Sequence, residues 1–103
     1  MWRKPNTTIS GEPFGLQMIE AVWAKGMPIV GFDPGQYRKD KCGAWMQRNL
    51  YGSTSQFGWE IDHIRPVSAG GGDALSNLEP LQWQNNRGKG DDYPQWSCSI
   101  SAA

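Results

Sequence analysis

The stretch that most restricts the fold of this chain runs from Trp59 to Pro94 and reads WEIDHIRPVSAGGGDALSNLEPLQWQNNRGKGDDYP. Residues 57–64 alternate loosely between apolar and polar and predict a strand that Pro66 ends. Residues 69–76 contain three consecutive glycines and predict a loop, and residues 78–83 predict a second strand. Pro80 is tolerated there if its missing N–H would have pointed outward. Residues 84–90 suit a short helix, so the stretch predicts a strand–loop–strand–helix unit.

The rest of the chain carries weaker signals. Residues 16–25 predict an amphipathic helix that Gly26 ends. Residues 27–34 predict an extended segment, residues 42–48 a strand and residues 52–56 a polar turn, whereas residues 95–103 predict a loosely held tail. A length of 103 residues suits one small domain. We therefore predict a single α+β domain, with residues 1–41 as a helical and extended N-terminal extension packed on a core of residues 42–94.

The charge balance restricts how the chain could bind nucleic acid. The ten basic residues are balanced by ten acidic ones, so the net charge does not attract a polyanion. Binding would have to come from local clusters of basic residues, for which solvated surface charge is the alternative interpretation. The candidates are Arg38, Lys39, Lys41, Arg65, Arg87 and Lys89. The sequence has no apolar run long enough to cross a membrane and no signal-peptide pattern, which predicts a soluble, cytoplasmic protein.

The two cysteines, Cys42 and Cys98, are far apart and neither belongs to a CxxC pair. A structural zinc site needs about four Cys or His ligands. Because the chain has three such residues in total, we expect no structural zinc. In a reducing compartment the two cysteines are predicted to be free thiols, with a disulfide left open as the alternative.

The residues that could carry chemistry lie in the same stretch. His63 is the only histidine; Asp62 precedes it, and Asn77 and Asn86 follow. An imidazole exchanges protons near neutral pH, and carboxylate and carboxamide oxygens are hard ligands for a divalent cation. This combination suits metal-assisted hydrolysis of a phosphodiester. A hydrogen-bonded structural role is the alternative for a lone histidine.

These motifs resemble the HNH endonuclease family, whose core is a ββα-metal finger. The resemblance rests on Asp62-His63-Ile64, the glycines at 70–72, Asn77-Leu78 and the helix that carries Asn86. The run Asn86-Arg87-Gly88-Lys89 is also similar to the HNH domain of RNA-guided CRISPR nucleases. Asn86 stands where the family name has its second histidine, which is the pattern of an HNN-type variant.

The resemblance implies a role for each residue. His63 would be the general base, Asp62 and Asn86 would hold the metal ion, and Asn77 would clamp the loop. Asn85 is the other candidate for the second metal ligand. Neighbouring helix residues point about 100° apart, so only one of the two can face the metal, and the family spacing selects Asn86. Glu60 could support the histidine or the metal. Arg87 and Lys89, with Arg65, would contact phosphates, whereas Arg38, Lys39 and Lys41 would contact the backbone without sequence preference. An oxygen-only ligand set favours Mg²⁺ or Mn²⁺ over zinc.

The sequence thus predicts a metal-dependent endonuclease that hydrolyses phosphodiester bonds of DNA by a one-metal mechanism. Double-stranded DNA is the expected substrate, with RNA, a homodimer and a partner protein left open. Two alternatives belong to other classes. One is a nucleic-acid-binding module that keeps the finger but cuts nothing, and the other is a structural or partner-binding domain.

Overall fold

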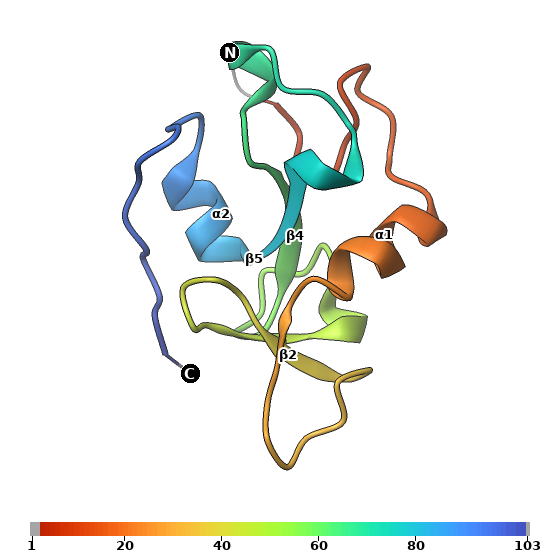
Figure 1. Ribbon diagram of the computed structural model, residues 1–103, viewed down its shortest axis with the longest axis vertical. Helices are drawn as coiled ribbons and strands as arrows, with labels where there is room; N and C mark the ends of the chain where they lie inside the picture. Colours follow the sequence, from red (N-terminus) through yellow and green to blue (C-terminus); the bar gives the residue numbers. More distant parts are fainter. Residues whose placement is uncertain (1–2, 103) are drawn as a thin grey trace.

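A computed structural model describes residues 3–102 as a small α+β domain with two helices and two antiparallel sheets. The predicted fold class is confirmed. Strand β4 (Trp59–His63), strand β5 (Leu78–Gln82) and helix α2 (Trp83–Lys89) form a ββα unit in the middle of the molecule (Figure 1). The predicted boundary between an N-terminal extension and the core at residue 41 stays a prediction.

The β4–β5 hairpin is regular, although Pro80 lies in its second strand. Ile61 is opposite Pro80, and its N–H donates to the Asn6 side chain (2.8 Å) rather than to β5. The two residues therefore form a non-hydrogen-bonded pair, in which both backbone nitrogens point away from the partner strand. An N–H at residue 80 would also have pointed outward. Proline therefore costs no hydrogen bond within the hairpin, as predicted.

Helix α2 begins directly after β5 and packs on one face of the hairpin. The Gln82 side chain caps it by accepting hydrogen bonds from the backbone N–H groups of Gln84 (2.7 Å) and Asn85 (3.2 Å). The helix ends at Gly90, whose φ of 52° lies in the region that glycine adopts without strain. These local signals place α2 within one residue of the predicted helix.

The opposite face of the hairpin carries the hydrophobic core. Helix α1 (Leu16–Trp23) packs against β5 there (Figure 1). A second sheet, formed by β1 (Met27–Pro28), β2 (Tyr37–Lys39) and β3 (Trp45–Gln47), lies beside it. The buried core residues are Phe14, Val22, Trp23, Met46, Trp59, Ile61 and Leu78. Each element contributes an apolar face, so the hairpin is fixed by packing on one side and left for polar side chains on the other.

The second sheet differs from the prediction for this part of the chain. Only Met27 and Pro28 of the predicted extended segment pair with a neighbour, and residues 29–34 form turns. The predicted strand at residues 42–48 is reduced to β3, because residues 40–43 form a tight turn held by the Asp40 carboxylate. Strand β2 was not predicted at all. Its three residues show no clear alternation, and pairing on both edges is what holds them extended.

The prediction of free cysteines and of a loose C-terminal tail is wrong. Cys42 and Cys98 form a disulfide bond. The tail runs back along α2 (Figure 1), where the Asn85 side chain accepts hydrogen bonds from the N–H groups of Ser99 and Ile100, both at 2.8 Å. The two cysteines meet because this return path brings the end of the chain to the turn that precedes β3.

Neither helix of residues 3–102 has the length and apolarity needed to cross a membrane.

Candidate active site

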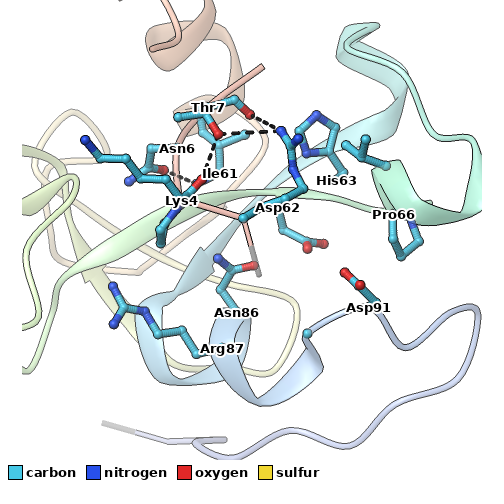
Figure 2. A pocket seen from close by; sticks show the side chains of 14 residues that line it. Lys4, Asn6, Thr7, Ile61, Asp62, His63, Pro66, Asn86, Arg87 and Asp91 are labelled. Carbon is cyan, nitrogen blue, oxygen red and sulfur yellow. Dashed lines mark hydrogen bonds between the residues drawn. The ribbon is translucent and has the colours of Figure 1, made fainter. Parts of the chain in front are cut away.

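Alternation along β4 distributes the polar residues of the site between two faces. Residues in a strand point to opposite sides in turn. Glu60 and Asp62 face α2, and His63 faces the other way, next to the Phe14 ring at a centroid distance of 5.9 Å. At the end of the strand both faces open into one pocket of about 300 Å³ (Figure 2).

The pocket brings together three of the four predicted catalytic residues. Asp62 and His63 come from β4 and Asn86 comes from α2. The N-terminal segment supplies a further wall, which the sequence did not predict. The lining residues are Arg3, Lys4, Pro5, Asn6, Thr7, Ile61, Asp62, His63, Pro66, Val67, Asn86, Arg87, Gly90 and Asp91.

His63 is oriented by a carboxylate that the sequence analysis missed. Its Nε2 lies 2.8 Å from Oδ1 of Asp73, a residue of the loop between β4 and β5. Both Asp73 oxygens also accept from the backbone N–H of Ile9, each at 3.2 Å, so the carboxylate is itself fixed. An Nε2–H donated to Asp73 leaves Nδ1 of the imidazole as the atom that can accept a proton.

Asp62 is buried and only half satisfied. Its Oδ1 lies 3.0 Å from the Lys89 ammonium, whereas Oδ2 has no hydrogen-bond partner among residues 3–102. Burial raises the pKa of the Asp62 carboxyl to about 8; the adjacent Glu79 carboxyl adds to the rise, and Lys89 opposes it. Glu79 is directly opposite Asp62 in the hairpin, so the two acids share one face. The proton is retained because water is excluded from the carboxyl.

Asn86 is held with its amide in a defined orientation. Its Nδ2 donates to Oε1 of Glu60 (2.8 Å), a carboxylate that is fully buried. Since the nitrogen faces Glu60, the amide oxygen points away from that carboxylate. Arg87 donates to the other oxygen of Glu60 at 2.8 Å, while its side chain stays half exposed. Glu60 therefore fixes both helix residues from the strand below them.

Asn85, the competitor of Asn86, lies on a different face of α2. Its side chain is fully buried and makes four hydrogen bonds, to the Asp40 carboxylate and to the backbone of Ser99 and Ile100. Every donor and acceptor of this amide is thereby engaged, three of the bonds with the C-terminal tail and one with Asp40. Asn85 is absent from the pocket lining, and Asn86 is present.

Asn77 closes the loop that connects β4 to β5. Its Oδ1 accepts from the N–H of Arg65 (2.8 Å), and its Nδ2 donates to the carbonyls of Arg65 (3.1 Å) and Gly72 (2.9 Å). The Asn77 backbone carbonyl also accepts from Ile64 N–H, at 2.8 Å. The side chain thus joins both ends of the loop next to His63 and lies outside the pocket.

The prediction that Lys89 contacts phosphates is wrong for this structure. Lys89 is only 2% exposed, and its ammonium bonds to Asp62 and to the His63 carbonyl oxygen, each at 3.0 Å. The helix turns this residue toward the sheet rather than toward solvent. Its long side chain places the ammonium against the buried Asp62 carboxyl instead of toward a polyanion.

Four of the predicted basic residues, Arg38, Lys39, Lys41 and Arg65, do not line the pocket. Arg38 donates to the backbone carbonyls of Pro34 and Gly26 at 2.9 Å, so it ties the second sheet to the end of α1. Lys41 pairs with Glu79 at 3.1 Å, and Arg65 bonds to the Ala69 carbonyl at 2.7 Å. Lys39 lies half buried on β2. Of the predicted phosphate contacts, only Arg87 reaches the pocket.

The donor atoms at the pocket fit a divalent cation that prefers oxygen. Asp62 offers the unpartnered Oδ2, and Asn86 offers an amide oxygen turned away from Glu60. Within residues 3–102, no group of three or more His, Cys, Asp or Glu side chains converges on one point. Magnesium is often bound by one or two protein oxygens, while water and phosphate oxygens complete its coordination shell.

Two features of the site escaped sequence reasoning. Asp73 is ten residues from His63 and reaches it only because the loop folds back, which its glycines permit but do not specify. Arg3 and Lys4 were not predicted to belong to the site, although both line the pocket. The signal that could have found them is Asn6, a residue type that tolerates the left-handed backbone and so often marks a sharp turn.

Comparison with protein families agrees with this geometry. Residues 54–95 match a family model described as HNH endonuclease, and the match contains β4, the loop, β5 and α2. Nothing among the curated proteins or the solved structures matches the chain. The matched residues carry Asp62, His63, Asn77 and Asn86, the positions on which the resemblance in the sequence rests. Residues 54–95 are thus similar to the HNH endonuclease family.

Proposed function

We propose that this chain is a metal-dependent endonuclease that hydrolyses phosphodiester bonds of DNA, with the HNN-type set of His63, Asp62 and Asn86 at its centre. The observation that carries the proposal is the convergence of these three side chains on one pocket, where a buried carboxylate oxygen of Asp62 lacks a partner among the described residues. An uncompensated buried oxygen is costly unless a ligand completes it.

His63 would act as the general base. The bond from Nε2 to Asp73 supports a tautomer in which Nδ1 takes the proton from the attacking water. Asp73 would also stabilise the imidazolium that forms. General-base catalysis by a positioned histidine contributes roughly 100- to 10,000-fold to the rate.

Asp62 and Asn86 would hold one divalent ion, Mg²⁺ or Mn²⁺. When bound, the ion polarises the phosphate and stabilises negative charge on the leaving oxygen. Glu60 keeps the Asn86 amide in place, and Lys89 neutralises the other oxygen of Asp62. Arg87, half exposed and anchored on Glu60, would bind a phosphate of the substrate.

DNA cleavage tests the proposal directly. Supercoiled plasmid would be incubated at low salt with the protein and Mg²⁺, Mn²⁺, Zn²⁺ or EDTA. We expect nicking or linearisation with Mg²⁺ or Mn²⁺ and none with EDTA. His63→Ala should lower the rate at least 100-fold because the proton acceptor is gone, while DNA binding persists.

Two controls make the result interpretable. Urea unfolding of His63→Ala checks that the variant is folded, and Lys25→Gln, outside the pocket, should cut at the wild-type rate. Cleavage that survives in His63→Ala would exclude this histidine as the base. If the folded wild-type protein binds DNA but does not cleave it with any of the metals, the result would instead favour a nucleic-acid-binding module without activity.

A further inference from the structure

The N-terminal segment forms a wall of the pocket that the predicted chemistry does not use. Asn6 has a φ of 62°, in the left-handed region that asparagine tolerates better than most residues. Its Oδ1 accepts from the Ile61 N–H at 2.8 Å. This bond attaches the segment to the edge of β4 that β5 does not cover, one residue from Asp62.

A closed turn then sets the direction of the residues before Asn6. The Thr7 hydroxyl donates to the Lys4 carbonyl at 2.7 Å, and Thr7 is itself buried. The Arg3 guanidinium bonds to the carbonyls of Thr7 and Thr8, so its charge is partly used in holding the turn. The backbone of the segment is therefore fixed against the sheet edge.

Lys4 is the residue that this arrangement leaves available. It is exposed and lines the pocket, and no hydrogen bond or ion pair engages its ammonium within residues 3–102. In Figure 2, Lys4 and Arg87 lie on one side of Asp62, and Asp91 lies on the other. The pocket therefore has a basic side, formed by residues from opposite ends of the chain, and an acidic side.

We propose that Lys4 binds a backbone phosphate of the nucleic-acid strand on the same side of the pocket as Arg87, so that the N-terminal segment and α2 both hold the strand there. This inference rests on the proposed function, because it names how the same site takes its substrate. A phosphate would avoid the Asp91 side of the pocket, where like charges repel. The two basic side chains thus define where the strand enters.

DNA binding measured apart from cleavage tests the inference. A fluorescent DNA duplex would be titrated with the His63→Ala chain in EDTA, over a series of salt concentrations. Adding Lys4→Gln should weaken binding roughly tenfold near 0.1 M salt and reduce the salt slope by about one, because one phosphate contact is lost. Lys4→Arg should retain most of the affinity.

Matched variants separate this contact from general charge effects. Lys25→Gln removes the same charge just after α1, outside the pocket, and should leave the salt slope unchanged. Asn6→Gly keeps the backbone conformation but loses the bond to Ile61, so it should weaken DNA binding in the same direction as Lys4→Gln. Urea unfolding of each variant confirms that it is folded.

Unchanged affinity and salt slope in Lys4→Gln would overturn the inference even if the wild-type chain cuts DNA. Equal losses in Lys4→Gln and Lys25→Gln would also overturn it, since only overall charge would then matter. A loss specific to Lys4→Gln in a chain that cuts nothing would support this contact and contradict the proposed nuclease activity. The two proposals therefore fail separately.

Discussion

At the scale of single residues, the site is built from pairs in which an acidic side chain fixes a functional one. Glu60 orients Asn86, and Asp73 orients His63. The choice of Asn86 over Asn85 could be predicted, because the angle between neighbouring helix residues and the family spacing together select one of them. The pairing of Asp73 with His63 could not, because it depends on the path of a glycine-rich loop.

Asp62 leads to a prediction about pH. Its pKa of about 8 means that a proton competes with the cation throughout the neutral range. In the His63→Ala background and without DNA, Mn²⁺ affinity measured by calorimetry should rise about tenfold per pH unit from pH 6 to 8 and level off above that. Asp62→Asn should bind weakly at every pH. Affinity that does not change with pH would show that Asp62 is already ionised.

The same carboxyl has a consequence for stability, with the sign fixed by linkage. Its pKa is raised from 3.8 in the unfolded chain to about 8 in the folded protein, so the folded state retains the proton more strongly. The retained proton on Asp62 therefore adds to the free energy of unfolding. This stabilisation is fully present below about pH 4 and is lost as the pH rises through about 8. Asp62→Asn removes this decline, which urea unfolding at several pH values would reveal.

At the scale of elements, β4, β5 and α2 could be predicted to within two residues because local chemistry ends each of them. Pro66 follows the first strand, the Gln82 side chain caps the helix and Gly90 closes it. Strand β2 could not be predicted, since Tyr37–Lys39 is extended only through its neighbours on both edges. Short strands of this kind depend on tertiary pairing rather than on their own sequence.

The glycine loop that connects the two strands of the finger offers a matched test. A Cβ on Gly71 would lie 1.7 Å from the Arg65 carbonyl oxygen and 2.9 Å from Asn77 Nδ2, whereas nothing lies within 4 Å of one on Gly72. Gly71→Ala should therefore lower the free energy of unfolding by about 2 kcal/mol or more and slow cleavage, because the loop carries Asp73. Gly72→Ala should stay within about 0.5 kcal/mol of wild type. Equal effects of the two changes in urea unfolding would contradict this account of the loop.

At the scale of the whole molecule, the two ends of the chain complete the central finger. The N-terminal segment attaches to the edge of β4, and the C-terminal tail lies along α2, held by Asn85 and by the Cys42–Cys98 disulfide. Neither contact could be predicted from sequence. The bond from Ile61 to Asn6 and the disulfide each join residues more than fifty positions apart, and Asn85 holds a tail that has no regular structure. The cysteine spacing alone does not indicate a pair.

The disulfide gives the last prediction. It closes a loop between residues 56 positions apart, so reduction should lower the free energy of unfolding by about 2–4 kcal/mol, mainly by releasing the unfolded chain. Urea midpoints with and without dithiothreitol measure this loss. The double variant Cys42→Ser and Cys98→Ser should unfold like the reduced protein and not respond to dithiothreitol. Equal midpoints for oxidised and reduced wild type would show that Asn85 and the packing of α2 are enough to hold the tail.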